Sequence, residues 1–258
     1  MNPERIVNGV VMWPRASLRT PFVRELAVVI SLLFVFVFLG LRFAFTTSPA
    51  FDEPFFLHAG YTNLTAGAPK VPTANLILAQ NWMALPLLSL PLKIPTAEDL
   101  KKLPAIEQEP GRLFLFHPEN DWRTIIHRAR IMNLVAGMAL ALTIYFWSRS
   151  VFGATGAAVS LAFYCLSPVM ISNSSLATTD IMTALWFALA LNRWWVLLHR
   201  ISIPNIITCG VATGLLFVTK ISSVVLVPMV VCLIVARMAS RRPVSVILCR
   251  MGHQATIA

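Results

Sequence analysis

The sequence is poor in charged residues. Asp, Glu, Lys and Arg make up only 12% of its 258 residues, while hydrophobic residues make up 57%. Because a soluble globular domain carries about 25% charged residues, this composition excludes a single soluble core and predicts a polytopic membrane protein. The net charge of +10 comes from basic residues placed singly at the ends of apolar runs, a pattern that indicates membrane topology and not nucleic-acid binding.

Cysteine is also scarce, and its spacing carries no signal for a metal site or a disulfide. The four cysteines form no CxxC or Cys/His pattern, and each lies in or near an apolar segment. We interpret them as small buried apolar residues. They are Cys165, Cys209, Cys232 and Cys249.

Long apolar runs are what the sequence has in abundance. A helix needs about 20 apolar residues to cross a bilayer, and six stretches meet or approach that length. They lie at residues 26–45, 129–147, 154–172, 181–198, 204–220 and 221–237. The first is too long for a signal-peptide core and no small-residue cleavage site follows it, so we expect a retained helix. The pattern predicts an all-α membrane protein with about six transmembrane helices.

The placement of arginine predicts the orientation. Arginines precede the first helix, which puts the N-terminus in the cytoplasm, and six crossings then bring each further arginine cluster to the same side. These residues are Arg5, Arg15, Arg19, Arg24, Arg149, Arg193, Arg200, Arg237, Arg241 and Arg242. We expect a multi-pass protein of the plasma (inner) membrane, or of the endoplasmic reticulum in a eukaryote. It would have a cytoplasmic N-terminus (1–25), a transmembrane domain (26–237) with a large outer segment (46–127), and a cytoplasmic tail (238–258).

The outer segment is expected to hold structure of its own. The stretch 74–92 is apolar but is broken by Pro86 and Pro91, so it is short for a span and predicts an interfacial or re-entrant helix. The polar stretch after it is expected to be a solvated connector, with a helix starting at Thr96.

Two adjacent carboxylates, Asp52 and Glu53, open this outer segment in "TTSPAFDEPFFLHAGYTNLTAG". One interpretation is a solvated cap of a helix that begins near Pro54. The other is a general base at a membrane-surface active site, where apolar walls raise the pKa of a carboxylate. Asp180 has the same two interpretations, but it begins an apolar run, where a charge needs a partner or water.

The predicted topology brings these acids to one membrane face together with basic residues. Cations would hold the phosphate of a lipid substrate and a carboxylate would activate the acceptor. For the arginines the alternative is simple snorkelling at a helix end. The basic residues are His127, Arg128, Arg130 and Lys220.

The order of these motifs resembles the N-terminal part of a GT-C glycosyltransferase of the protein O-mannosyltransferase and aminoarabinose-transferase type. The motifs are "FDEPFFLHAGYTNLTAG", the "ALPLL" helix, "HRARIMNLVAGMALALTIYFWSRSVFG", "SLAFYCLSPVMISNSSLATTD" and "GVATGLLFVTKISSVVLVP". The resemblance runs from about Arg24 to about Pro228. It implies an inverting transferase that moves a sugar from a polyprenyl- or dolichyl-phosphate carrier to a lipid or protein acceptor at the outer face.

The resemblance also implies roles for single residues. Asp52 would be the general base, Glu53 a supporting residue and Asp180 a second carboxylate of the site. The candidate substrate-binding residues are Arg128, Arg130, Lys220, His58 and Tyr61. Some relatives bind a divalent metal, for which the ligands would come from Glu53, His58, His117 and Glu119, but this spacing matches no metal-binding pattern and we assign no metal site.

Two departures from the family shape the rival hypotheses. The "H-P-P-L" element that many relatives carry after the acidic pair is absent, and the chain ends after six predicted spans. We therefore expect an incomplete GT-C fold. The alternatives are an inactive truncated member of the family and a membrane transporter, although a transporter should bury its charges at mid-membrane on broken helices.

Overall fold

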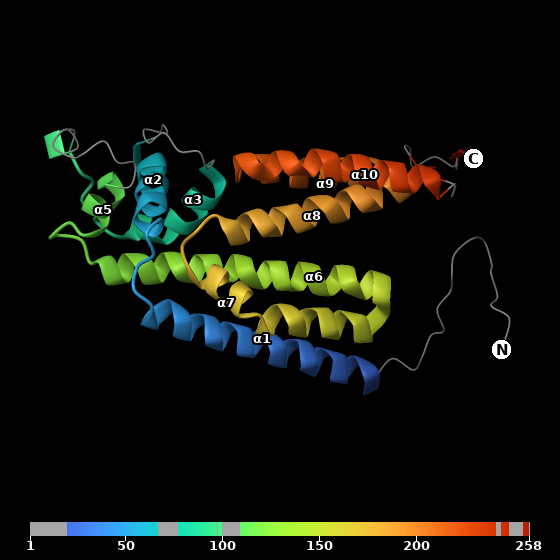
Figure 1. Cartoon of the computed structure of the whole chain (residues 1–258), viewed down its shortest axis with the longest axis horizontal. Helices are drawn as coiled ribbons and strands as arrows, with labels where there is room; N and C mark the ends of the chain where they lie inside the picture. The colour runs from blue at the N-terminus through green and yellow to red at the C-terminus, as the bar shows by residue number, and fades with distance from the viewer. Residues whose placement is uncertain are drawn as a thin grey trace.

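The computed structural model describes residues 20–66, 77–96, 98–99, 109–240, 244–247 and 255–257. Most of these residues are helical, and the long helices lie side by side in a bundle (Figure 1). Several residues used in the sequence predictions lie outside the described part of the chain. They are Arg5, Arg15, Arg19, Arg241, Arg242 and Cys249.

The predicted apolar stretches are all helical. They lie in α1 (Thr20–Thr46), α6 (Trp122–Leu166), α7 (Pro168–Ser175), α8 (Asp180–His199), α9 (Ile203–Phe217) and α10 (Leu226–Ala239). Within the described residues, four segments are long and apolar enough to cross a membrane. They are Val23–Thr46, Trp122–Leu166, Asp180–His199 and Ile221–Ala239, and Ile203–Phe217 is a shorter apolar helix. The predicted polytopic helical membrane protein is thereby confirmed.

The 45 residues of α6 form two helices and not one, because the chain reverses direction within it (Figure 1). The reversal occurs at Gly153, whose φ of 73° and ψ of −172° lie in a region that is essentially restricted to glycine. The second and third predicted spans are therefore the two limbs of a hairpin. The fifth predicted helix, 204–220, was too long at its C-terminal end, because α9 ends at Phe217. The 3-10 helix η2 (Ile221–Val225) then precedes α10.

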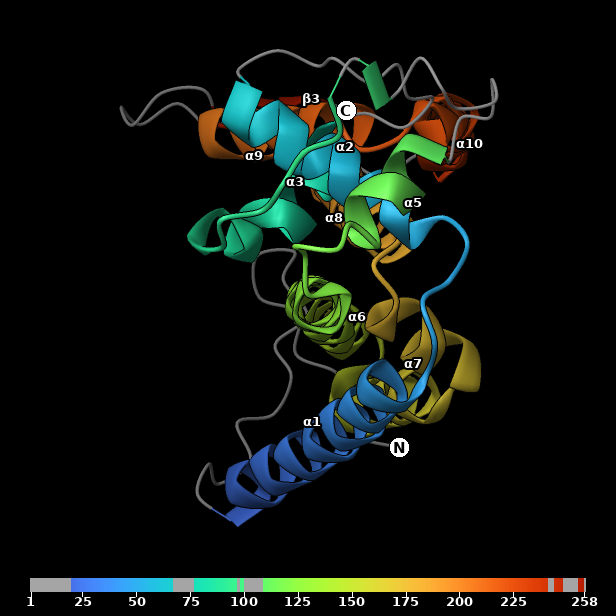
Figure 2. The ribbon, with the colours of Figure 1, turned by 90° about the vertical axis from the view of Figure 1, so that its left-hand side faces the viewer.

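The described parts of the predicted outer segment form a layer of short helices across one end of the bundle, here called the outer layer (Figures 1 and 2). The layer consists of α2 (Glu53–Ala66), α3 (Ile77–Ala84), the 3-10 helix η1 (Leu85–Ser89) and α5 (Glu109–Leu115). Its core contains the fully buried side chains of Met83, Leu87 and Phe114. The layer is attached to the bundle where the indole Nε1 of Trp82 donates to the carbonyl of Met132 at 2.8 Å.

The helix predicted within 74–92 is thus the pair α3 and η1, with Pro86 at the start of η1. The helix start predicted at Thr96 also has the expected local bonds. The Thr96 hydroxyl accepts from the backbone N–H of Asp99 at 3.3 Å, and the Asp99 carboxylate accepts from the backbone N–H of Thr96 at 3.0 Å. This reciprocal pattern is a capping box, which fixes a helix N-terminus.

The segments that the arginine pattern assigns to the cytoplasmic side all lie at the opposite end of the bundle. The N-terminus of α1, the turn at Gly153, the α8–α9 connection and the C-terminal end of α10 all lie there (Figure 1). A small sheet, which the all-α prediction did not include, also forms at this end. Its strand β1 (Arg200–Ser202) pairs in parallel with β2 (Val244–Ile247), and β2 pairs antiparallel with β3 (Ala255–Ile257).

Candidate active site

The acidic pair lies where α1 has ended and α2 begins, at the junction between the bundle and the outer layer. Asp52 is exposed and immediately precedes α2, and its carbonyl accepts the first helical bond from the N–H of Phe56 at 3.2 Å. Among the described residues, no side chain or backbone group bonds to the Asp52 carboxylate. Asp52 therefore presents an available proton acceptor at the surface of this junction.

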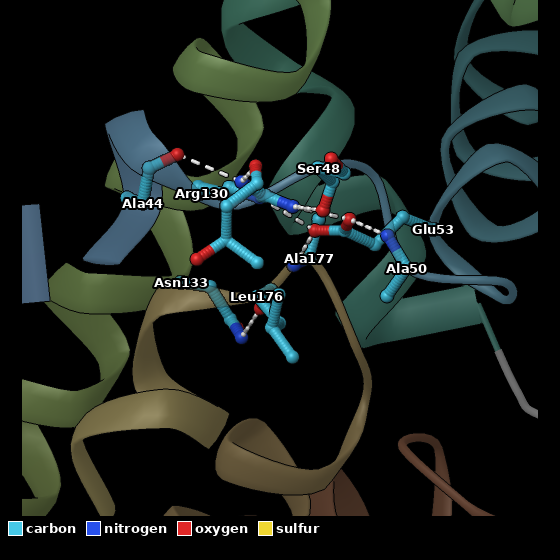
Figure 3. Close-up of polar contacts among 9 residues, drawn as sticks. Ala44, Ser48, Ala50, Glu53, Arg130, Asn133, Leu176 and Ala177 are labelled. Atoms are coloured by element: carbon cyan, nitrogen blue, oxygen red, sulfur yellow. Dashed lines mark hydrogen bonds and ion pairs between the residues drawn. The ribbon is translucent and has the colours of Figure 1, made fainter.

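Glu53, the adjacent residue, has the opposite environment. Its side chain is 0% exposed, and both of its oxygens are fully used (Figure 3). Oε1 accepts from Arg130 Nε at 2.8 Å and from the N–H of Ala177 at 2.7 Å. Oε2 accepts from Arg130 Nη2 and from the N–H of Ala50, both at 2.7 Å. Four acceptor positions are occupied, so Glu53 has no capacity left to take a proton from a substrate.

Arg130 completes this arrangement from α6, and its side chain is also 0% exposed. A guanidinium has five N–H groups, and two of them bond to Glu53. The other three donate to the carbonyls of Ala44, Thr47 and Ser48 at 2.7, 2.8 and 3.0 Å (Figure 3). These carbonyls belong to the C-terminal end of α1 and the turn after it, where helix carbonyls lack partners within the helix.

The Glu53–Arg130 pair is therefore a fully satisfied buried salt bridge that joins four segments of the chain. It holds the end of α1, the 47–50 turn, the start of α2 and the 176–177 loop onto α6. The expectation that Arg130 contacts a substrate phosphate does not fit this geometry, because no N–H of Arg130 remains. The pair instead fixes the backbone on both sides of Asp52, which agrees with the supporting role expected for Glu53.

The same junction holds the loop that leads to Asp180. Asn133 of α6 donates from Nδ2 to the carbonyl of Leu176 (Figure 3) and to the carbonyl of Asn173. Glu53 accepts from the next residue after Leu176, Ala177. Only two residues lie between Ala177 and Asp180, so the two acidic segments are kept at one end of the molecule, as the topology predicts. Asp180 begins α8, and its carboxylate accepts from Lys220 Nζ at 2.7 Å.

The Asp180–Lys220 pair differs from the Glu53–Arg130 pair in its exposure. The side chains of Asp180 and Lys220 are 55% and 30% exposed. In the described part of the chain, Asp180 is the sole hydrogen-bond partner of the Lys220 ammonium, which leaves two of its three N–H groups available. Lys220 was predicted to contact the substrate phosphate, and its ammonium remains accessible at this end of the bundle.

His58 and Tyr61, the other two predicted substrate contacts, lie inside the outer layer. Both rings pack against Phe114 of α5, with centroid distances of 5.4 and 5.7 Å. The Tyr61 hydroxyl donates to the carbonyl of Leu90 at 3.3 Å. Burial lowers the pKa of His58 to about 4, so its imidazole is neutral near pH 7. Both residues hold α2 against α5 and η1 and do not face the surface that exposes Asp52.

Arg128 is on the wrong side of α6 for the predicted site. Residues two apart on an α-helix point about 200° apart, so Arg128 and Arg130 project from opposite faces. Arg128 Nη1 donates to Ser89 Oγ at 2.6 Å and to the carbonyl of Pro86 at 3.2 Å, both in η1. The structure thus places Arg128 on η1 and Arg130 on the acidic pair, and a contact between Arg128 and a substrate stays a prediction.

Metal binding receives no geometric support among the described residues. No three His, Cys, Asp or Glu side chains there come together in a way that could hold a metal ion. Of the suggested ligands, Glu53 is saturated by nitrogen donors, and the Nδ1 atom of His117 accepts from the N–H of Glu119 at 3.2 Å.

The part of the chain from Ile125 to Met251 has a recognisable sequence family. Residues 125–251 match the model of the dolichyl-phosphate-mannose-protein mannosyltransferase family. The GT-C resemblance inferred from the motifs is confirmed. This is a family of membrane glycosyltransferases that use polyprenyl-phosphate sugar donors. The match covers α6 to β2 and does not include the acidic pair. No curated protein and no solved structure matches the chain significantly.

The sequence analysis missed the residues that position the acidic pair. Asn133 and the backbone N–H groups of Ala50 and Ala177 were not singled out, although they fix both acidic segments. A polar Asn in the middle of an apolar run was the available signal for Asn133, since a polar side chain inside a membrane helix needs a partner.

Proposed function

We propose that this protein transfers a sugar from a polyprenyl- or dolichyl-phosphate carrier to a lipid or protein acceptor, with Asp52 as the general base. Asp52 would accept the proton of the acceptor hydroxyl while the acceptor oxygen attacks the anomeric carbon. The bond from that carbon to the carrier phosphate breaks, and the configuration inverts. The reaction would take place at the outer face of the membrane.

The contrast between the two acidic neighbours is the observation that carries this proposal. A general base needs an accessible oxygen with a free lone pair, and Asp52 has one while Glu53 does not. The Glu53–Arg130 pair supports the assignment because it holds the Asp52 backbone from both sides without using the Asp52 carboxylate. Rigid placement of this kind is what a catalytic base requires.

Lys220 supports the same reaction from the other acidic segment. The leaving carrier phosphate develops negative charge as the bond breaks, and a nearby cation stabilises it. In the proposed site Asp180 orients the Lys220 ammonium, and the remaining N–H groups face the phosphate. In this proposal the 51–53 turn supplies the general base, and the turn between α9 and η2 supplies the contact to the phosphate.

The proposal is tested by sugar transfer in membranes from cells that express the chain, with labelled polyprenyl-phosphate sugars as donors. Because general-base catalysis contributes roughly 10²- to 10⁴-fold, Asp52→Asn should lower the transfer rate by at least 10²-fold at equal protein level. The melting temperature should stay within about 2 °C of the wild type, since the Asp52 carboxylate makes no bond in the described structure.

Asp121→Asn is the matched control. Asp121 is an exposed aspartate at the same end, but it caps α6 by accepting from the N–H of Arg123 at 3.1 Å. It should retain transfer within about threefold. Equal rates in the wild type and Asp52→Asn would exclude Asp52 as the base. Absence of transfer in both, with an active relative assayed in parallel, would favour the inactive-member alternative.

A further inference from the structure

A groove on the outer end of α6 combines one cation with apolar walls. It is open to the surface and has a volume of about 350 Å³ between the second and third turns of α6 and the 3-10 helix η1. Arg128 lies in the groove, and the wall residues Leu85 and Ile131 are exposed. The groove is lined by Leu85, Pro86, Ser89, Arg128, Ile131 and Met132.

The charge of Arg128 is held in place but is not neutralised. Its Nη1 atom uses both N–H groups on Ser89 Oγ and the carbonyl of Pro86, and these bonds fix the guanidinium against η1. Within the described residues no carboxylate pairs with Arg128, and its Nε and Nη2 groups find no acceptor. Arg128 therefore brings three N–H groups without an acceptor in the described structure, and a full positive charge, to the lining of the groove.

The position of the groove on a membrane helix indicates which kind of ligand would bind there. A partly buried cation on a membrane helix is costly unless an anion or water meets it, and the anions at this depth are lipid phosphates. Three fixed N–H groups match the oxygens of a phosphodiester, while the leucine and isoleucine walls match an acyl chain. No carboxylate beside Arg128 in the described structure would bind the ammonium of a zwitterionic headgroup, so an anionic headgroup fits better.

The carrier phosphate is the less suitable occupant. Arg128 and Arg130 project from opposite faces of α6, and the Asp52 turn is bound to the Arg130 face. In both views α3 lies on one side of α6, while α1 and α7 lie on the other (Figures 1 and 2). A phosphate bound to Arg128 would therefore be separated from Asp52 by the helix itself.

We propose that the groove between α6 and η1 binds an anionic glycerophospholipid of the phosphatidylglycerol type, with its phosphodiester on Arg128 and an acyl chain against Leu85 and Ile131. The lipid would cover the junction between the outer layer and the bundle. It would do so on the face opposite the proposed active site. The inference does not depend on the proposed catalytic role of Asp52.

The proposal is tested by native mass spectrometry of the full chain in detergent, titrated with palmitoyl-oleoyl phosphatidylglycerol. The wild type should retain one tightly bound lipid, and Arg128→Gln should weaken that binding about tenfold. Arg42→Gln is the matched control. Arg42 is an exposed arginine at the same end of the bundle, whose guanidinium makes no hydrogen bond within the described structure, and its replacement should leave the binding unchanged.

Ser89→Ala separates a built site from simple snorkelling. It keeps the Arg128 charge but removes the hydroxyl that holds it, so a built site predicts about threefold weaker binding and snorkelling predicts no change. Equal binding in the wild type, Arg128→Gln and Ser89→Ala would overturn the proposal, with helical content checked by circular dichroism.

Two competition experiments then test the identity of the occupant. Displacement of the retained lipid by polyprenyl phosphate would assign the groove to the carrier and overturn the proposal, and the expected result is no displacement. Phosphatidylcholine should bind more weakly than phosphatidylglycerol, and equal affinity would overturn the preference for an anionic headgroup.

Discussion

Two ion pairs hold the loop between α7 and α8, and they have opposite surroundings. Glu53–Arg130 lies at the start of this loop, is 0% exposed on both sides and uses every donor and acceptor that it has. Asp180–Lys220 lies at the end of the loop, is 30–55% exposed and makes a single ammonium–carboxylate contact. The first has no donor or acceptor left for another group, whereas the second leaves two N–H groups of the Lys220 ammonium without a partner in the described structure.

The comparison shows that a stabilising ion pair and an accessible ion pair can lie at the two ends of one short loop. A buried pair with excellent geometry makes its removal expensive, because the remaining partner would be a buried, uncompensated charge. An exposed pair contributes little to stability, because water and salt screen it. Asp52 and Glu53 are adjacent in the sequence, but only the carboxylate of Glu53 takes part in the bonds that hold this junction together.

The largest expected effect is the loss of the buried pair. Glu53→Gln and Arg130→Met each leave one buried charge without its partner, so each should destabilise the fold by about 3–5 kcal/mol. Thermal unfolding in detergent, followed by a thiol-reactive or intrinsic fluorescence signal, measures this change. Glu53→Gln replaces one acceptor oxygen with an NH2 group, so it also loses the bond from either Ala50 or Ala177. Arg130→Met also loses the bonds to the carbonyls of Ala44, Thr47 and Ser48, which loosens the end of α1.

The double variant Glu53→Gln with Arg130→Met sharpens this prediction. It removes both charges, so it should recover part of the stability that either single variant loses, as expected for coupled partners. Fully additive losses would show that the two side chains stabilise the junction independently, which would contradict their description as one unit.

A smaller effect is expected from His58, which is buried in the same layer without an ionic partner. Its pKa is lowered from about 6.5 to about 4 by burial, so below pH 6.5 the unfolded state binds a proton that the folded state does not. Stability attributed to His58 should therefore fall as the pH drops from 6.5 towards 4, by about 3 kcal/mol in total.

The pH dependence of the melting temperature tests this statement. His58→Leu should flatten the slope between pH 6.5 and pH 4.5, whatever its effect on stability at pH 7. Met83→Leu, at a buried residue of the same layer that does not titrate, should keep the wild-type slope. An unchanged slope in His58→Leu would mean that other groups dominate acid unfolding. A flattened slope in His58→Leu would show that His58, which is buried without an ionic partner, lowers the stability at acidic pH. The buried Glu53–Arg130 pair, in contrast, stabilises the fold because its charges have partners.

The spans, the outer layer and the gathering of acids at one end could be predicted because their signals are local. An apolar run of about 20 residues, a proline or a capping pattern is complete within one or two helical turns. The bonds that occupy Glu53 and leave the Asp52 carboxylate without a partner in the described structure could not be predicted in the same way. The partners of Glu53 are 77 and 124 residues away in the chain, and the rotation of α6 decides whether Arg128 or Arg130 reaches it.

The smallest expected effect on stability belongs to the exposed pair. Lys220→Gln removes a screened contact and should cost less than about 1 kcal/mol, so the melting temperature should hardly change. Its effect on sugar transfer should be larger than its effect on stability, because the proposed role of Lys220 is to stabilise the leaving phosphate. Transfer assays with Lys220→Gln and Lys220→Arg separate the two contributions, since arginine retains the charge. If Lys220→Gln instead lost as much stability as Glu53→Gln, both ion pairs would be structural, and the proposed phosphate contact would have to lie elsewhere.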